Sequence, residues 1–379
     1  MQWFARLGRE TELCAAELAA IYHGQLVISG HFVIGEHQPP VWDTLGGVVR
    51  AGTIISPKQL SKRELITTLI SLLPEVKGKL RIGLSAPGLP IHELKRLGQT
   101  VKKQLSSTGQ SARIIYPIRG DELNTAQLDA NHLLDEPHLE INLIKIEQDR
   151  WLLGRTQWRQ DISSYSLRDR GRPARDARVG MLPPKLAQIM LNLANVAAGD
   201  HVHDPFCGTG VVLIEALLKH AQVSGSDISS DMVSATRRNL DWAHTMLKIP
   251  SNVTAITQQD ARQLKLPPGT THIVAEGYLG NPDLAGLSSQ RFHTEATNLE
   301  RLYTTYFRHL LSYREPLTIV MALPVWYPSH ESRIELDILD DLSDMGYTLE
   351  QFAPTGWTRL HYHRHGQTVG RSIIKLRKD

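Results

Sequence analysis

The fold is decided by three successive segments: HDPFCGTG at residues 203–210, a helical run at residues 211–219, and VSGSD at residues 223–227. This order predicts a strand, a glycine-rich turn, a helix and a second strand that ends in an acid, which is the opening unit of a nucleotide-binding α/β domain. The two glycines of the turn tolerate main-chain angles that other residues resist, so a bulky ligand can lie against bare backbone. Asp227, at the end of the second strand, is placed to accept hydrogen bonds from a ribose.

Two kinds of ligand suit such a turn, a dinucleotide and S-adenosylmethionine, and two details favour S-adenosylmethionine. A dinucleotide turn carries a third glycine inside the helix, and Leu213 occupies that position here. Asp204 at the start of the turn would repel a pyrophosphate, but it can accept hydrogen bonds from the ammonium group of a methionine. The spacing from Asp204 to Asp227 is close to the roughly 20 residues expected between such a turn and the ribose-binding acid.

We therefore predict S-adenosyl-L-methionine as the cofactor. A dinucleotide enzyme and a generic α/β domain with an acidic loop are the alternatives. The predicted cofactor-binding residues lie in the turn, after the second strand, and after a third β-type run at residues 253–257, where an acid is placed to hold the adenine amino group: Asp204, Phe206, Gly208, Gly210, Asp227, Ile228, Asp260 and Ala261.

Composition and charge narrow the class of protein. The apolar share of 41% and the charged share of 21% are typical of a soluble globular protein. No apolar run approaches the roughly 20 residues of a membrane span, and the N-terminus lacks the pattern of a signal peptide, so we expect a cytoplasmic protein with no membrane contact. The two cysteines, Cys14 and Cys207, lack metal-ligand spacing, and we expect no bound metal.

A net charge of +3 makes no strong case for nucleic acid, but positive charge is concentrated in one segment. Residues 165–178 hold five arginines and two aspartates together with glycine and proline. This composition is typical of a solvated connection between domains, and equally of a strap that contacts RNA phosphates through the forked guanidinium groups. Under the second interpretation the candidate RNA-binding residues are Arg168, Arg170, Arg172, Arg175 and Lys185.

Strand and helix patterns divide the chain of 379 residues into two halves. Before residue 160, short β-type runs with few helices suggest one or two compact α+β units. After the arginine-rich segment, strands alternate with helices, among them predicted helices at residues 186–194 and 231–240. This alternation predicts an α/β fold with a doubly wound parallel sheet, whose ligand lies at the carboxyl ends of the strands.

Several segments carry a family resemblance: LGRETELCAAEL at residues 7–18, LGRT at 153–156, RDRGRP at 168–173, GMLPPKLA at 180–187, DPFCGTG at 204–210 and QTVGR at 367–371. Together they resemble the THUMP-containing tRNA guanosine methyltransferases, which methylate the exocyclic 2-amino group of a guanosine near position 10 of the tRNA. The likeness spans most of the chain, weakly in the first half and specifically from residue 153 to residue 243.

The resemblance implies an arrangement of domains and a set of ligands. It implies an N-terminal ferredoxin-like unit at residues 1–55, a THUMP-like RNA-binding domain at 56–158, a linker at 159–180 and a Rossmann-type methyltransferase domain at 181–379. It also implies tRNA as the partner. In this family, the residues that match Asp204, Gly208, Gly210, Asp227 and Asp260 bind S-adenosylmethionine.

The chain departs from this family where the chemistry is expected. After the fourth strand of the sheet, the family carries an Asp or Asn, two prolines and an aromatic residue, which accept hydrogen bonds from the target amine and stack on the flipped base. Here the predicted strand at residues 271–275 runs into Glu276, Gly277, Tyr278 and Leu279. Glu276 keeps a carboxylate and Tyr278 keeps an aromatic face, so we predict these two as the catalytic residues.

Three interpretations of this loop compete. It is a working variant, which we favour; it serves another RNA or a DNA base; or methylation has been lost and the protein binds RNA on a degenerate cofactor fold. A nicotinamide-dependent oxidoreductase is the rival from another enzyme class. The favoured prediction is an S-adenosylmethionine-dependent methyltransferase acting on guanosine in tRNA.

Overall fold

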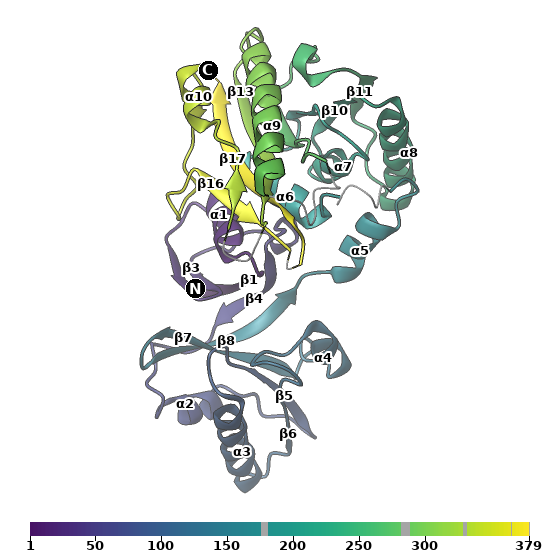
Figure 1. Cartoon of the computed structure of the whole chain (residues 1–379). Coiled ribbons are helices and arrows are strands. Elements are labelled where there is room, and N and C mark those ends of the chain that lie inside the picture. The colour runs from purple at the N-terminus through teal and green to yellow at the C-terminus, as the bar shows by residue number, and fades with distance from the viewer. Residues whose placement is uncertain (176–180, 282–288, 329–331, 365, 379) are drawn as a thin grey trace. The chain divides into compact units, whose positions relative to one another are not determined.

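The computed structural model describes residues 1–175, 181–281, 289–328, 332–364 and 366–378. By its internal contacts the chain forms two compact units (Figure 1). The first comprises residues 1–11, 22–43 and 48–160, and the second comprises residues 12–21, 44–47 and 161–379. The arginine at position 178 of the predicted linker lies outside the described residues.

The first unit is built on an eight-stranded mixed sheet in the order β2-β3-β1-β4-β8-β7-β5-β6. Its β5 pairs in parallel with β6 and β7, and the remaining pairs are antiparallel. The strands are β1 (Gln2–Leu7), β2 (Leu26–Ser29), β3 (Phe32–Glu36), β4 (Val48–Ile54), β5 (Leu80–Ser85), β6 (Ala112–Ile115), β7 (Leu139–Glu147) and β8 (Arg150–Arg159), and the helices are α2 (Leu65–Ser71), α3 (Ile91–Ser107) and α4 (Thr125–Ala130).

Helix α3 shows why these segments fold as they do. Leu94, Gly98, Val101 and Leu105 recur at helical spacing and are the buried residues of this helix. The three apolar side chains among them pack with those of β5 and β7 in one core cluster. The first unit therefore has the strand-rich α+β character expected for the first half of the chain.

The second unit is built on a nine-stranded sheet with a parallel centre in the order β11-β10-β9-β12-β13. These strands are β9 (His201–Asp204), β10 (Gln222–Asp227), β11 (Val253–Gln258), β12 (His272–Glu276) and β13 (Leu317–Trp326). The antiparallel edge is completed by β17 (Val369–Lys378), which pairs with β13, and by β14 (Ile334–Glu335), β15 (Thr348–Leu349) and β16 (Arg359–Tyr362).

The strand order reverses at β9, which lies between β10 and β12. In an open parallel sheet, such a reversal leaves a crevice at the carboxyl ends of the two neighbouring strands, because the connecting helices depart to opposite faces. The fold thereby places a candidate ligand site at the ends of β9, β10 and β12.

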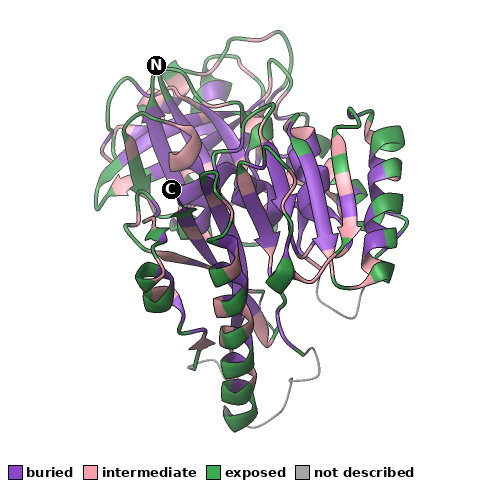
Figure 2. Ribbon diagram, turned by 90° about the horizontal axis from the view of Figure 1, so that it is seen from above, coloured by how far each residue is buried: buried purple, intermediate pink, exposed green. Residues whose placement is uncertain are grey.

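Helices cover both faces of this sheet. Side chains of α6 (Pro184–Leu193), α7 (Val211–Leu218) and α8 (Ser230–Leu247) pack in one core cluster, and side chains of α9 (Ser289–Leu310) pack in the other. The remaining helical elements are α1 (Thr11–Ile21), α5 (Ile162–Arg170), α10 (Leu339–Asp344) and the short turns η1 (Trp42–Thr44) and η2 (Ala261–Gln263). Figure 2 shows the buried residues concentrated in the strands and the exposed ones on the outer sides of the helices.

Helix α1 belongs by its contacts to the second unit, although it follows β1 of the first. Its Glu17 is fully buried and accepts hydrogen bonds from the main-chain N–H groups of Gly46 and Gly47 and from the side chain of Asn192. Burial raises the pKa of Glu17 to about 7, and these donors act in the opposite direction. This network brings together residues that are far apart in the chain.

Candidate cofactor and active site

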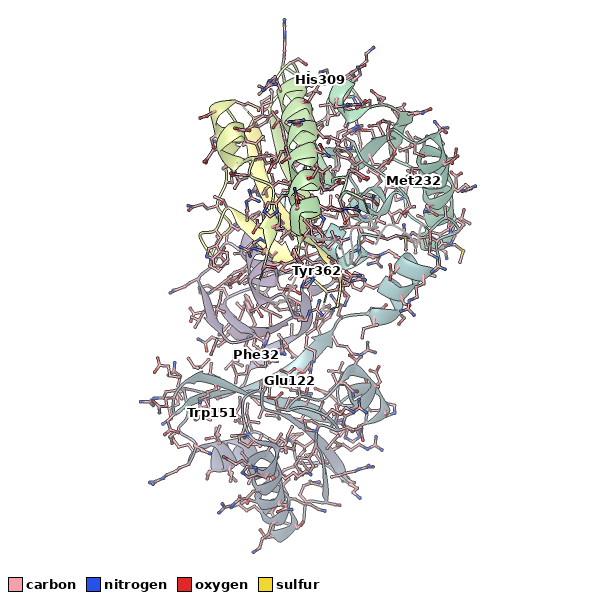
Figure 3. All side chains as sticks on the ribbon, viewed as in Figure 1. Phe32, Glu122, Trp151, Met232, His309 and Tyr362 are labelled. Carbon is pink, nitrogen blue, oxygen red and sulfur yellow. The ribbon has the colours of Figure 1, made fainter. Side chains whose placement is uncertain are left out.

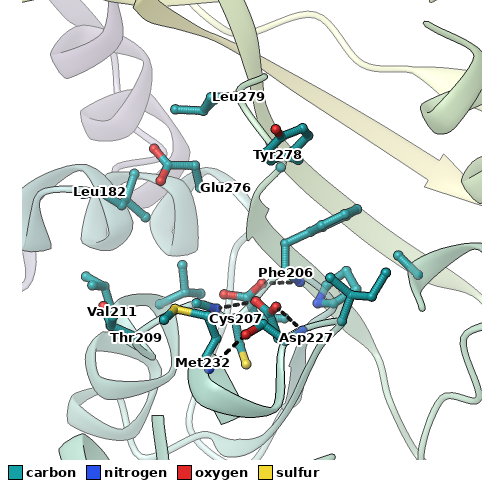
Figure 4. Close-up of a pocket in the computed structure, with 18 of the residues that line it drawn as sticks. Leu182, Phe206, Cys207, Thr209, Val211, Asp227, Met232, Glu276, Tyr278 and Leu279 are labelled. Carbon is teal, nitrogen blue, oxygen red and sulfur yellow. Dashed lines mark hydrogen bonds between the residues drawn. The ribbon is translucent and has the colours of Figure 1, made fainter. Parts of the chain in front are cut away.

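A cavity of about 640 Å³ opens where the strand order reverses. It is lined by the ends of β9, β10 and β12, by the turn after β11, and by apolar side chains that include Leu182, Met232 and Leu302. Met232 lies on α8, as Figure 3 shows. In Figure 4, Asp227 lies by the glycine turn, and Glu276 and Tyr278 lie above it at the opposite side of the pocket.

The glycine turn has the conformation that its sequence predicts. Gly208 and Gly210 have φ angles of 51° and 80°, in the left-handed region that favours glycine. Gly210 is the N-cap of α7, and a Cβ there would lie 3.1 Å from a side-chain carbon of Thr236. The turn can therefore approach a ligand closely with bare backbone.

Asp204 ends β9 and begins this turn. Its Oδ1 accepts a hydrogen bond from the N–H of Phe206 at 3.0 Å. Burial raises the pKa of Asp204 well above its ordinary value, and the charges of Asp227 and Glu276 raise it further. An acid in this state gains from a cationic partner, which is what the ammonium group of a methionine moiety would supply.

Asp227 ends β10 and is held by two main-chain donors. Its Oδ2 accepts from the N–H of Gly208 at 2.9 Å, and its Oδ1 accepts from the N–H of Ser229 at 2.9 Å. A carboxylate offers about four lone-pair positions, so both oxygens keep capacity for a further donor such as a ribose hydroxyl. Ile228, which follows it, is 65% exposed and lines the cavity.

Asp260 and Ala261 lie at the start of η2 and also line the cavity. The Oδ1 of Asp260 accepts from the N–H of Arg262 at 2.9 Å, and its carboxylate forms an ion pair with the Arg262 guanidinium at 2.6 Å. The Arg262 hydrogen bond lowers the pKa of Asp260, so an ionised acceptor faces the pocket. All eight predicted cofactor residues except Gly210 are on the cavity wall.

Glu276 ends β12 and lines the same cavity. Its Oε1 accepts a hydrogen bond from the Nε of Arg371 on β17 at 2.7 Å, which forms an ion pair. Burial raises the pKa of Glu276, while the charge and the hydrogen bond of Arg371 act in the opposite direction.

The Gly277-Tyr278 loop is held from α9. The hydroxyl of Tyr303 donates to the carbonyl of Tyr278 at 2.8 Å, and the N–H of Gly277 donates to the carbonyl of Ala322 at 3.0 Å. A Cβ on residue 277 would lie 2.3 Å from the Tyr303 hydroxyl oxygen, and a proline there would also lose the N–H. These contacts leave no room for a side chain at position 277 while Tyr303 stays in place. The Tyr278 side chain is 46% exposed at the cavity rim.

The arginine-rich segment is divided between surface and interior. Residues up to Arg170 form α5, whose Asp161 N-cap accepts from the N–H groups of Ser163 and Ser164. Arg168 is buried and pairs with Glu215 of α7 at 2.6 Å, and Arg172 is buried and donates to Thr209 Oγ1 at 3.0 Å.

The other predicted RNA contacts lie differently. Arg170 and Arg175 are exposed, whereas Lys185 is partly buried with its ammonium 5.0 Å from the ring centroid of Tyr165. The segment is thus helical up to Arg170, two of its arginines are buried, and only two of the five candidates have exposed side chains.

Two residues of the site carried no predicted role. Tyr303 lies within an amphipathic helix, and nothing in its sequence surroundings distinguishes it from a core aromatic. Arg371 lies in the QTVGR segment, which contributed to the family resemblance, but its partner Glu276 is 95 residues away in the chain.

Comparison with known proteins agrees with this geometry. Residues 172–276 match the model of the UPF0020 family, described as an RMKL-like methyltransferase domain. The match favours the predicted methyltransferase interpretation over a dinucleotide enzyme, and the matched residues include the glycine turn, Asp227 and Glu276.

Two curated relatives match parts of the chain. The tRNA (guanine(10)-N2)-dimethyltransferase of Methanothermobacter thermautotrophicus is 40% identical over 118 residues, which cover 31% of this chain and 33% of the relative. The enzyme of the same name from Methanocaldococcus jannaschii is 32% identical over 164 residues, which cover 43% and 44%. The chain thus spans a third to less than half of the length of these relatives.

Solved structures match the fold over its full length. TrmN from Thermus thermophilus aligns with a TM-score of 0.55 at 17% identity and covers 100% of both chains. A possible methylase from Clostridium difficile 630 aligns with a TM-score of 0.52 at 11% identity and covers 98% of this chain and 97% of the other. These matches confirm the predicted fold class, an α/β protein whose Rossmann-type domain follows an α+β region.

Two further findings concern the described part of the chain. Its histidine, cysteine, aspartate and glutamate side chains form no group of three or more that could hold a metal ion. None of its helices combines the length and the apolar character that crossing a membrane requires.

Proposed function

We propose that this chain is an S-adenosylmethionine-dependent methyltransferase that modifies the exocyclic 2-amino group of a guanosine in tRNA. The observation that carries the proposal is the position of Glu276, an ion-paired carboxylate on the wall of the cavity that also holds the predicted cofactor residues. The names of the relatives supply the tRNA guanine, and the domain match supplies the reaction class.

The residues of the cavity fit the cofactor. Asp227 is fixed by two main-chain donors and keeps acceptor capacity for ribose hydroxyls, Asp204 suits an ammonium group, and Asp260 suits the adenine amino group. Apolar side chains such as Met232 and Ile228 offer surface to the adenine ring. When bound, S-adenosylmethionine supplies an electrophilic methyl group.

Glu276 is the proposed acceptor for the target amine. A carboxylate at the end of β12 would accept an N–H of the amine, turn its lone pair toward the cavity and stabilise the positive charge that grows on nitrogen. It need not be a strong base, because the amine proton becomes acidic once the nitrogen is methylated. Alignment of the reacting groups is expected to contribute most of the catalysis, since positioning alone is worth roughly 7 to 11 kcal/mol.

Tyr278 is the proposed stacking face for the base. Its side chain is half exposed at the cavity rim, while its carbonyl is held by Tyr303. A partly exposed aromatic on a fixed main chain suits a base that enters from solvent, because the ring is available and the loop does not have to be ordered on binding. In addition, we assign RNA phosphate contacts to Arg170 and Arg175, and RNA binding to the THUMP-like region at residues 56–158.

The proposal is tested by transfer of labelled methyl from S-adenosylmethionine to unmodified total tRNA, followed by nucleoside analysis. We expect label in 2-methylguanosine or its dimethyl form. The Glu276→Ala variant should lose most turnover and keep its affinity for S-adenosylmethionine. Absence of label with a wild-type protein that binds the cofactor would favour the alternatives, another RNA or DNA base or a binding protein without turnover.

A further inference from the structure

Arg371 of β17 reaches the proposed amine acceptor, Glu276 of β12, across the strand β13 that lies between them. We infer that Arg371 is a positioning residue for methyl transfer, which keeps the Glu276 carboxylate ionised and fixed in direction at the cavity wall. This inference rests on the proposed function, since it concerns the same site. Arg371 does not itself line the cavity, so it acts through Glu276.

The register of the sheet shows how the two side chains meet. Glu276 of β12 is opposite Ala322 of β13, and Arg371 of β17 is opposite Pro324 of the same strand. Residues two apart on a strand point to the same face, and Val274, Ala322 and Ile373 all belong to the core cluster that α6 and α7 cover.

Glu276 and Arg371 therefore share that face of the sheet. Between them on β13 lie only small side chains, Ala322 and Pro324, which allow the arginine to reach across the strand. The result is the contact of 2.7 Å between Nε and Oε1.

The surroundings of Glu276 oppose its ionisation unless a cation is close. The Glu276 side chain is only 18% exposed, and that of Arg371 only 5%. Groups that face Glu276 from the packed elements are Asp204 on β9, Tyr303 on α9 and Arg364 in the β16–β17 connection, besides Arg371 itself.

Of these neighbours, only the two arginines favour the carboxylate form of Glu276. Burial raises the pKa values of Asp204 and Tyr303 well above their usual ranges, and the charge of Glu276 raises both further, so Tyr303 remains a neutral hydroxyl. Arg364 lowers the pKa of Glu276 less than Arg371 does. The buried guanidinium of Arg371 is thus the main group that favours the carboxylate form.

Arg371 also restrains a side chain that has more freedom than the family's shorter acid. Glutamate has one more rotatable bond than aspartate. A Glu276 carboxylate that exchanges between rotamers would spend less time aligned with the target amine. A hydrogen bond from a buried guanidinium fixes the position of Oε1, and neighbouring strands hold both main chains. The longer acid and the arginine are therefore expected to work as a pair.

Three variants separate this role from simple structural support. Arg371→Met removes the cation, Arg371→Lys keeps the charge without the Nε–H donor, and Arg377→Met on the same strand removes an arginine that pairs with Glu350 outside the site. For each, kcat and KM are measured against pH with tRNA and S-adenosylmethionine. The titration of Glu276 is followed by carbon-13 NMR of labelled glutamate carboxyls, with its signal identified by its loss in Glu276→Gln.

We expect Arg371→Met to lower kcat at neutral pH by about tenfold or more and to move the acid limb of the kcat profile upward by about one pH unit. KM for S-adenosylmethionine should change by less than about threefold, because the cofactor contacts are intact. Arg371→Lys should return the acid limb of the kcat profile to its wild-type pH but recover only part of kcat. Arg377→Met should match the wild type in both. Arg371→Met should add nothing to Glu276→Gln, which lacks the carboxylate.

The outcomes are distinguishable from failure of the proposed function. If the wild-type protein transfers no methyl group, the proposed function is wrong, and an unchanged Glu276 carboxyl titration in Arg371→Met overturns the present inference on its own. If the wild type is active, an unshifted acid limb and an unchanged kcat in Arg371→Met overturn the inference. Should Arg371→Met fail to fold, the Arg371→Lys variant decides: a wild-type kcat there contradicts a fixing role.

Discussion

The hydroxyl of Tyr303 donates to the carbonyl of Tyr278 across 2.8 Å, and it lies where any side chain on residue 277 would have to be. A Cβ at that position would be 2.3 Å from the hydroxyl oxygen but 3.0 Å from the nearest ring carbon. The position of the loop that carries Tyr278 therefore depends on Tyr303 of α9, which both bonds the loop and fills the space beside Gly277.

This dependence predicts a compensating pair of substitutions. Gly277→Ala should displace the loop and lower turnover by on the order of 10- to 100-fold, because misplacement by about 1 Å is costly in catalysis. Tyr303→Phe alone should cost about 1 kcal/mol of stability for the lost hydrogen bond. The double variant should be more active than Gly277→Ala alone, because the clashing oxygen is gone. Steady-state kinetics of the three variants test this, and additive losses would contradict it.

Asp227 carries the second prediction. Its carboxylate bonds the N–H groups of Gly208 and Ser229, so Asp227→Asn should both weaken the proposed ribose contact and loosen the turn. We expect the affinity for S-adenosylmethionine to fall by about 1 to 3 kcal/mol, with little change in kcat at saturating cofactor. Isothermal titration measures the affinity. Asp231→Asn, an exposed acid in the first turn of α8, is the matched control and should bind as the wild type does.

His203 gives the protein a predictable acid sensitivity. This histidine of β9 is buried with its two ring nitrogens against the hydroxyls of Ser224 and Ser226, and burial lowers its pKa to about 3. An unfolded histidine titrates near 6.5, so the unfolded chain binds the proton first. The contribution of His203 to stability is therefore fully present above about pH 6.5 and is lost as the pH falls toward 3.

A variant isolates this contribution. Urea unfolding of the wild type and of His203→Gln should give free energies of unfolding that converge as the pH falls, with slopes that differ by up to about 1.4 kcal/mol per pH unit in that window. The exposed His92→Gln serves as control and should run parallel to the wild type. Parallel curves for His203→Gln would show that this residue does not titrate between the two states.

The arginines of α5 and its continuation make the fourth prediction. Arg170 and Arg175 are exposed, whereas Arg168 and Arg172 have partners inside the domain. Alanine at the two exposed positions should weaken tRNA binding and lower the salt dependence, by about 0.7 to 0.9 in the slope of log affinity against log salt for each phosphate that is no longer neutralised. Lysine at both positions should retain the slope. Arg168→Ala should instead destabilise the domain, because it leaves the buried Glu215 without its partner.

The parts of the site that could be predicted from sequence are those that depend on local conformation. The turn of Gly208 and Gly210, the acid at the end of β10 and the helix that follows are specified within about 25 residues, and the structure contains each of them. The predicted helices at residues 186–194 and 231–240 are present as α6 and as the first part of α8.

What could not be predicted depends on contacts between distant segments. The pairing of Arg371 with Glu276 spans 95 residues and that of Arg168 with Glu215 spans 47, so a sequence pattern shows neither. Arginines beside glycine and proline are typical of an exposed connection between domains. In the structure, however, Arg168 is buried, because its guanidinium pairs with the buried carboxylate of Glu215. Likewise, α1 joins the second unit through contacts with distant segments, among them the hydrogen bond between Glu17 and Asn192, 175 residues later.

The proposed methyl acceptor is the 2-amino group of a guanosine in tRNA, and the names of the relatives point to position 10. The most direct test compares two otherwise identical tRNA molecules, one with guanosine and one with inosine at that position, because inosine lacks only the 2-amino group. With labelled S-adenosylmethionine, the account predicts transfer to the guanosine tRNA and none to the inosine tRNA. Equal labelling of both, or labelling of neither by a protein that binds the cofactor, would contradict it.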